Sequence, residues 1–114
     1  MSDCIFCKIA AGEMGVKFLY ETDTLVAFRD INPQAPTHVL VIPKKHIAKI
    51  SDLSGEDIAL VGEMVAAGNR IAATEKIAED GYRLVFNCGR HGGQEVFHIH
   101  LHLLGGRPMN WPPG

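Results

Sequence analysis

The sequence lacks an excess of charge of one sign, a long apolar run and a cysteine-rich framework. Its 114 residues hold 11 Lys and Arg against 13 Asp and Glu, a formal net charge of −2. No bulk electrostatic attraction to nucleic acid or to an anionic membrane surface is therefore expected. No stretch is long and apolar enough to span a bilayer. Three cysteines, an odd number, argue against a disulfide framework.

The chain also has no evident internal repeat, low-complexity tract or linker. Its first residues, Met1 to Cys4, lack the basic segment and apolar run of a secretory signal. We therefore expect one globular domain over residues 1–114, located in the cytoplasm, that binds neither nucleic acid nor membranes.

Hydrophobic periodicity predicts an α+β fold with one short helix, one long helix and a five-stranded antiparallel sheet. The short helix is expected over residues 4–11. The long helix should begin at the N-cap Ser54 and bury a stripe of side chains. The expected stripe is Ile58, Val61, Val65, Gly68 and Ala72, with Met64 and Ile71 beside it. Strands are expected over residues 18–21, 25–29, 38–43, 82–87 and 98–104.

The most informative segment alternates histidine with apolar residues, His98-Ile99-His100-Leu101-His102. This period of two predicts a strand with its three histidines on one face. Phe97, Ile99, Leu101 and Leu103 should share the opposite face. Since a strand rises about 3.3 Å per residue, the outer histidines should lie about 13 Å apart. We therefore expect the three to divide their tasks rather than to converge on one ion.

Cys4 and Cys7 form a Cys-x-x-Cys pair. Such a pair is typical of redox or metal sites, and the βαβ context that a thioredoxin-like redox site needs is missing. Zinc would need two further ligands, and two Cys with two His make a common tetrahedral set. Simple burial of the thiols remains open.

A glycine-rich loop, residues 88–95, leads into the histidines. Its Gly89, Gly92 and Gly93 would let backbone N–H groups approach a ligand closely. An anion held there beside an imidazole would suit phosphoryl or acyl transfer.

The histidine segment with Leu103-Leu104 resembles the motif of the histidine triad (HIT) family. Further segments resemble the family's Hint branch: residues 30–38, 41–46, 105–107 and 111–114. The resemblance covers nearly the whole chain and implies a homodimeric purine nucleoside phosphoramidate hydrolase, with its sheet extended across the dimer. Such enzymes release AMP or GMP and an amine.

The resemblance implies a role for each catalytic residue. His100 would attack the α-phosphorus and form a nucleotidyl-histidine intermediate. A neutral imidazole is a good nucleophile near pH 7. His102 would contact the phosphate and help to protonate the leaving amine, and His38 would complete the polar cluster.

The same resemblance implies a nucleotide site. Apolar side chains would sandwich the purine, Asp30 would bind the ribose hydroxyls, and Asn87, Glu95 and Val96 would lie at the phosphate, the last two through their backbone N–H groups. From the residues alone, Asp30 equally suits a turn cap. The purine residues are Ile5, Phe6, Ile9 and Phe28, which composition alone would place in a core.

A structural zinc ion is implied as well, because some relatives bind one through a Cys-x-x-Cys pair and two histidines. Here the ligands would be Cys4, Cys7, His46 and His98. Chemistry itself would need no cofactor.

Two other functions remain open on the sequence. The chain could be a nucleotide-binding scaffold that acts through protein partners. It could also be a zinc-dependent hydrolase that uses the histidine strand as metal ligands.

Overall fold

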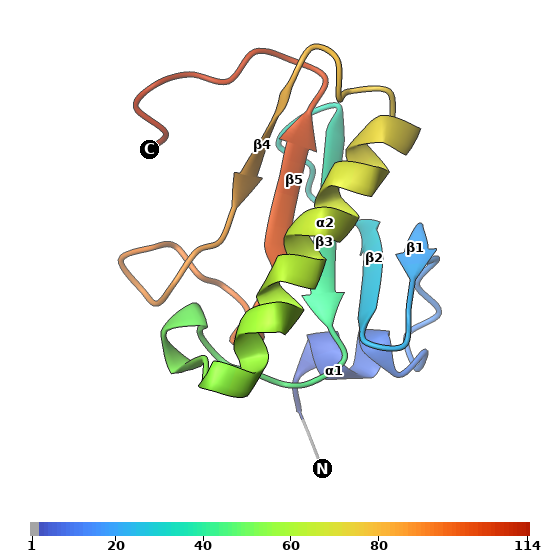
Figure 1. Ribbon diagram of the computed structural model, residues 1–114, viewed down its shortest axis with the longest axis vertical. Coiled ribbons are helices and arrows are strands. Elements are labelled where there is room, and N and C mark those ends of the chain that lie inside the picture. Colours follow the sequence, from blue (N-terminus) through green and yellow to red (C-terminus); the bar gives the residue numbers. More distant parts are fainter. Residues whose placement is uncertain (1–2) are drawn as a thin grey trace.

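A computed structural model describes residues 3–114 of the chain. A five-stranded, fully antiparallel sheet has its first three strands side by side in chain order, with the fifth strand between the third and the fourth. The long helix α2 (Ile58–Thr74) crosses one face of this sheet, as Figure 1 shows. The short helix α1 (Ile5–Ala10) packs on the other face. The predicted α+β architecture is confirmed.

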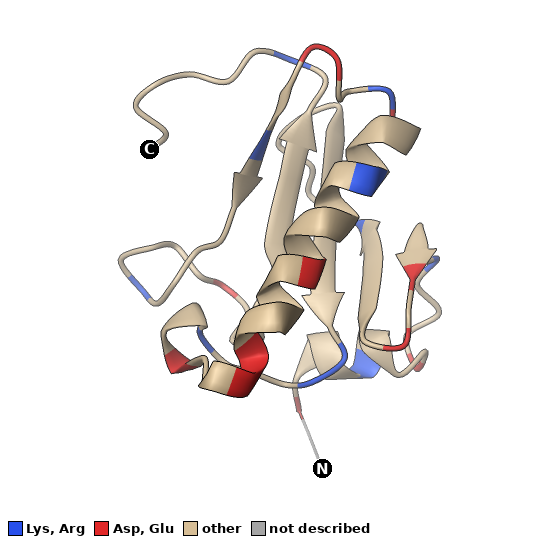
Figure 2. Ribbon diagram, in the orientation of Figure 1, with Lys and Arg blue, Asp and Glu red and all other residues tan. Residues whose placement is uncertain are grey.

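The strands are β1 (Tyr20–Glu21), β2 (Leu25–Arg29), β3 (Thr37–Pro43), β4 (Tyr82–Val85) and β5 (Leu101–Gly105). Two short 3₁₀ turns, Ile50–Asp52 and Gly55–Asp57, lead into α2. In the described part of the chain, neither helix is long and apolar enough to cross a membrane. Figure 2 shows few charged residues on the central strands.

The central strands are buried on both faces, which explains their continuous apolar runs. In β3, Val39 and Val41 face the cluster under α2, whereas Leu40 and Ile42 face the cluster under α1. Since successive strand side chains point to opposite faces, both sides of the strand contribute to a core. All seven residues of β3 are buried.

The buried stripe of α2 is shifted from the predicted one. Met64, Gly68, Ile71 and Ala72 are buried together with Ala67, so Met64 is a core residue as predicted. Ile58 is 61% exposed, and its predicted place in the stripe was wrong. The physical reason is helix geometry: Ile58 precedes Met64 by six residues, which is about 120° around an α-helix, so its side chain points away from the buried face.

The histidine strand is shorter than predicted. Strand β5 begins at Leu101, so His98 and His100 lie on an irregular segment before it. Pairing with β3 ends at Val41 and Leu101, because Pro43 has no N–H to continue the ladder. Ile99 instead donates its N–H to the carbonyl of Ile47, at 2.8 Å.

The predicted alternation of faces nevertheless holds from Ile99 onward. Ile99, Leu101 and Leu103 join the core under α2. Phe97, expected on that face, is 47% exposed because it lies in the bend that precedes Ile99.

Acidic residues gather at the start of α2 (Figure 2), where Asp57 holds two segments together. Its Oδ2 accepts hydrogen bonds from the backbone N–H and hydroxyl of Ser54, both at 3.0 Å. Its Oδ1 accepts a bond from Lys45 Nζ at 2.6 Å. The predicted N-cap Ser54 thus begins the 3₁₀ turn that precedes the helix. Lys45 and these donors lower the pKa of Asp57 to about 2.

We predict that Asp57→Asn destabilises the protein at neutral pH. The pKa of Asp57 is lower in the folded than in the unfolded chain, so its stabilising effect is present above about pH 3.8 and is lost as the pH falls through about 2. Urea unfolding at several pH values should show wild type and variant converging below pH 2. Glu56→Gln, which removes only an exposed contact with Lys45, is the control and should behave as wild type. A constant difference between D57N and wild type down to pH 2 would contradict the assignment.

Candidate functional site

Four buried or half-buried histidines meet on the α1 side of the sheet. His38 comes from β3, His102 from β5, and His98 and His100 from the segment before β5. His98 is fully buried and His100 is 7% exposed. The rings of His100 and His102 lie 4.9 Å apart between centroids. Because charged imidazoles are poorly solvated there, burial lowers the pKa of all four side chains.

Backbone groups determine which nitrogen of His98 and His100 holds the proton. A neutral imidazole has one N–H, and a carbonyl oxygen can only accept. His100 Nδ1 lies 2.8 Å from the carbonyl of His98, so Nδ1 donates and Nε2 keeps its lone pair. His98 Nε2 lies 2.8 Å from the carbonyl of Pro43, so its Nδ1 keeps the lone pair.

The same reasoning shows which ring nitrogen holds the proton in His38 and in His102. The backbone N–H of Gln34 donates to His38 Nδ1 at 3.0 Å, so the proton of His38 is on Nε2. That nitrogen lies 2.9 Å from His102 Nδ1, which must accept. The proton of His102 is therefore on Nε2. The site thus offers one nucleophilic nitrogen, on His100, and one N–H donor, on His102.

These rings open onto a cavity of about 250 Å³. Asp30 and Asn87 line it, as does the exposed side chain of Glu95. Asn32, Gln34 and Gly93 complete the wall together with His38, His100 and His102. The negative charges of Asp30 and Glu95 raise the pKa of His100 and so oppose part of the effect of burial.

Asp30 is placed both to cap a turn and to make a polar contact at the cavity. Its Oδ1 accepts a hydrogen bond from the N–H of Asn32 at 2.8 Å, which is a turn cap. Its Oδ2 lies 3.4 Å from His38 Nε2 at the cavity. One oxygen stabilises the loop and the other faces the polar site.

The residues expected around a purine lie beside this cavity but do not line it. Phe6 contacts His100 edge-on, with centroids 5.1 Å apart, and contacts Phe28 in the same way at 5.8 Å. Phe6, Ile9 and Phe28 are buried, while Ile5 is 39% exposed. Val96 packs against the same apolar cluster.

A second cluster brings Cys4, Cys7, His46 and His98 together, with one ligand atom of each within 4.8 Å of the others. The Nδ1 atoms of His46 and His98 are 3.2 Å apart. Cys7 Sγ lies 3.2 Å from His46 Nδ1, and Cys4 Sγ lies 3.4 Å from His98 Nδ1.

The donor set of this cluster fits a tetrahedral metal ion. Tetrahedral zinc, with Zn–S of about 2.3 Å and Zn–N of about 2.0 Å, places its ligand atoms roughly 3.3–3.8 Å apart. His98 turns its lone pair toward the cluster because its N–H is held by Pro43, which is the outer hydrogen bond that zinc-binding histidines usually make. These four residues could therefore hold a metal.

Asp30, His38 and His102 also lie close enough together to be considered as metal ligands. The proton assignment disfavours this set, because His38 Nε2 holds a proton and has no lone pair to offer. A catalytic metal at the histidine strand therefore has little support from the geometry.

Sequence reasoning missed the side chain that shapes the glycine-rich loop. Gln94 is buried; its Oε1 accepts the N–H of Gly89 at 2.8 Å, and its Nε2 donates to the carbonyl of Ala48 at 2.7 Å. At Gly92 a Cβ would lie 2.6 Å from the carbonyl oxygen of Cys88, so only glycine fits this turn. A glutamine in a glycine-rich loop gives no sign in the sequence that it is buried.

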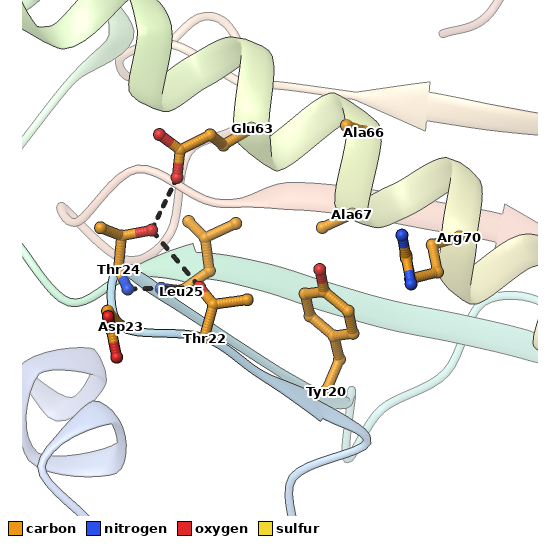
Figure 3. A pocket seen from close by; sticks show the side chains of 9 residues that line it. All are labelled: Tyr20, Thr22, Asp23, Thr24, Leu25, Glu63, Ala66, Ala67 and Arg70. Carbon is orange, nitrogen blue, oxygen red and sulfur yellow. Dashed lines mark hydrogen bonds between the residues drawn. The ribbon is translucent and has the colours of Figure 1, made fainter.

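A further cavity, of about 410 Å³, lies between α2 and the β1–β2 turn (Figure 3). Its wall includes Tyr20, Glu63 and Arg70, and Thr24 donates a hydrogen bond to Glu63 at 2.7 Å. It contains no histidine or cysteine and lies on the α2 side of the sheet. The cluster of His38, His100 and His102 lies on the opposite face.

Comparison with known proteins decides the family. The model of the HIT domain matches residues 11–109. The chain belongs to the HIT family. The purine nucleoside phosphoramidase of Escherichia coli strain K12 is 52% identical over 107 residues, which cover 94% of this chain and 90% of that protein. The prediction of HIT-family membership is confirmed.

Solved HIT structures share the fold. A HIT family hydrolase from Legionella pneumophila is 55% identical, with a TM-score of 0.96, covering 98% of this chain and all of that one. A zinc-bound histidine triad protein from Mycobacterium smegmatis is 37% identical, with a TM-score of 0.80, covering 92% of this chain and 76% of that one.

We predict that His102 titrates far below an ordinary histidine. Burial, followed by the neighbouring His100 and His38, lowers its pKa from 6.5 to about 4. Because the unfolded chain takes up this proton first, acidification from pH 6.5 to 4 should lower the stability of the ligand-free protein. NMR titration of the assigned ring measures the pKa directly, and the same ring in urea is the control. A native value near 6.5 would show that the ring is solvated.

Proposed function

We propose that the protein is a nucleotide hydrolase that cleaves purine nucleoside 5′-phosphoramidates to a nucleoside monophosphate and an amine. The observation that supports this most strongly is the orientation of His100. Its Nδ1–H is held by a backbone carbonyl, which leaves the Nε2 lone pair for attack. The name of the E. coli relative supports the same substrate class.

In the first step, His100 Nε2 attacks the α-phosphorus and the P–N bond breaks. The N–H of His100 stays on Nδ1, where the carbonyl of His98 stabilises the positive charge of the phosphorylated ring. A covalent intermediate divides one difficult displacement into two easier ones.

The departing nitrogen needs a proton. His102 lines the cavity, and because its Nδ1 accepts from His38, its own proton on Nε2 is the one left to give. In the empty site His38 and His102 are neutral, since burial lowers both pKa values. A bound phosphate is negatively charged, so it raises the affinity of this pair for protons. The pair therefore gains one proton with the substrate and gives it to the amine.

In the second step, water attacks the phosphorus of the intermediate. The His38–His102 pair, now neutral again, accepts the proton of this water. Nucleoside monophosphate is released and His100 returns to its neutral form. The pair loses this proton when the monophosphate leaves, so the site returns to its starting form and atoms and charge balance without a cofactor.

For the nucleotide, we assign the base to the apolar side chains beside His100 and the ribose to Asp30. Phe6 supports this, because it contacts the His100 ring and lies in the same cluster as Ile9 and Phe28. Asn87, Glu95 and Val96, with the latter two acting through their backbone N–H groups, would place the phosphate against His100 and His102. Exposed Ile5 would cover the open side of the base.

We also propose that Cys4, Cys7, His46 and His98 hold a structural zinc ion. The ion would fix α1 and the Pro43–His46 turn to the segment that precedes His100. The zinc-bound relative from M. smegmatis supports this, as do the ligand separations. The thiolates that such a site needs suit a reducing compartment such as the cytoplasm.

A homodimer is the last part of the proposal. Strand β4 is at the end of the sheet and pairs only with β5 among the described strands. Trp111, in the tail that follows β5, is 83% exposed. Pairing of two chains along this side would cover an open edge.

We predict that His100→Gln abolishes hydrolysis of an adenosine 5′-phosphoramidate, because the amide side chain cannot form the covalent intermediate. The rate constant kcat should fall by ~10³-fold or more, with the nucleotide still bound. Steady-state kinetics and titration with AMP measure the two effects. His91→Gln, which changes an exposed histidine of the adjoining loop, is the matched control. Full activity of H100Q would contradict the proposal.

We predict one zinc ion per chain, lost in Cys7→Ser. Loss of the ion should lower the free energy of unfolding by ~3 kcal/mol where free zinc exceeds its dissociation constant 100-fold. Metal analysis and thermal unfolding test this, with Cys88→Ser as the control because Cys88 lies outside the cluster. Activity measured well below the melting temperature should persist. Equal metal content in C7S and wild type would refute the site.

A further inference from the structure

The segment Gly105-Gly106-Arg107, at the end of β5, takes no part in the proposed chemistry. It turns directly against the loop that follows β2. Gly106 has φ of +90°, and a Cβ there would lie 2.8 Å from Pro36 Cβ. Glycine is therefore required both by the backbone conformation and by the close approach to this loop.

Because the two segments lie close together, the side chain of Arg107 hydrogen-bonds the backbone of Gln34 in this loop. Its Nε and Nη2 donate to the carbonyl of Gln34 at 3.3 and 2.9 Å, and its Nη1 donates to the carbonyl of Pro108 at 2.9 Å. The two-pronged contact fixes the direction of the carbonyl as well as its position, because the guanidinium is planar and rigid.

Gln34 is also the residue whose N–H sets the tautomer of His38. Its backbone is thus held at both ends, with the carbonyl on Arg107 and the N–H on His38 Nδ1. The side chain of Gln34 adds a bond from Nε2 to the carbonyl of Asn32, at 3.0 Å. A chain of hydrogen bonds therefore runs from Arg107 through Gln34 and His38 to His102.

If the backbone of Gln34 were no longer held, the ring protons of His38 and His102 would change nitrogens, and His102 would present a different group to the substrate. Without the N–H of Gln34, only the longer contact with Asp30 Oδ2, at 3.4 Å, would favour a proton on Nε2, and His38 could hold its proton on Nδ1 and present a lone pair to His102 Nδ1. Two lone pairs at 2.9 Å repel, so His102 would move its own proton to Nδ1. His102 Nε2 would then have no proton to give to the leaving group.

We propose that Arg107 is a positioning residue that keeps the proton of His102 on Nε2 by holding the backbone of Gln34. This inference rests on the proposed function, since the proton matters only if His102 acts as a donor. Arg107 also lines a cavity of about 520 Å³ that adjoins the site and shares His38 and His102 with it. Direct contact with substrate is therefore the competing role that the experiment must separate.

The chain offers a matched control in Arg83. This arginine lines the same adjoining cavity and also donates to a backbone carbonyl of the tail, that of Asn110, at 2.7 Å. Within residues 3–114, Arg83 makes no hydrogen bond or ion pair with Gln34 or His38. Arg83→Gln removes the same charge and a similar tail contact, and it leaves the path to His102 intact.

The test compares Arg107→Gln, Arg107→Lys and Arg83→Gln in the full chain. We expect R107Q to lower kcat about tenfold, a part of the 10²–10⁴ that a positioned general acid contributes, with KM little changed. Nitrogen-15 NMR of His38 should show its proton shifting from Nε2 toward Nδ1. R107K should recover only part of the rate, because lysine cannot grip the carbonyl with two donors, and R83Q should match wild type in every measurement.

Three results would overturn the proposal. A rise in KM at constant kcat would mean that Arg107 binds substrate. Equal losses of kcat in R107Q and R83Q would show a general effect of the tail. An unchanged His38 tautomer in R107Q would show that Arg107 does not control the proton of His38. If R107Q does not fold, R107K is judged by the same measurements. The NMR result does not depend on turnover, so it stands even if wild type fails to cleave phosphoramidates.

Discussion

The arrangement of this site depends on hydrogen bonds between imidazole rings and the backbone. A neutral imidazole has one proton, and at three rings a backbone group decides where that proton is. The carbonyls of Pro43 and His98 hold protons of His98 and His100, and the N–H of Gln34 displaces the proton of His38 to Nε2. Because burial lowers the pKa of each of these rings, the neutral forms persist and the assignment holds at neutral pH.

The fold supplies these groups by burying the sheet on both faces. Alternation along β5 directs Leu101 and Leu103 to the core under α2 and leaves His102 on the face that α1 covers. The change from regular strand to irregular chain before Leu101 then separates two tasks. His98 reaches the cysteines, and His100 reaches the cavity, although only one residue stands between them.

The sequence alone predicted the alternation of strand faces, the fold class and the buried position of Met64, because each of these follows from hydrophobic periodicity. It was insufficient for the start of β5, which depends on where Pro43 interrupts the partner strand. Phe97 is exposed because it lies in the bend before β5, and Ile58 is exposed because it begins α2 on the side turned away from Met64. Periodicity describes the interior of an element and says little about its ends.

Hydrophobic periodicity also could not predict contacts between residues that lie far apart in the sequence. The hydrogen bond from Arg107 to Gln34 joins residues 73 positions apart, and the one from Gln94 to Ala48 joins residues 46 positions apart. The meeting of Cys4 and Cys7 with His46 and His98 was expected only from the resemblance to the HIT family, and the structure brings these four side chains together. The roles assigned to them, and to the residues around the nucleotide, stay predictions.

The most direct measurement is isolation of the covalent intermediate. Wild-type protein should be quenched in acid-free denaturant within milliseconds of mixing with a labelled adenosine 5′-phosphoramidate and then mapped by peptide mass spectrometry. The account predicts one adenylyl group per chain, attached to Nε2 of His100. Turnover without any adduct, or an adduct on another residue, would contradict it.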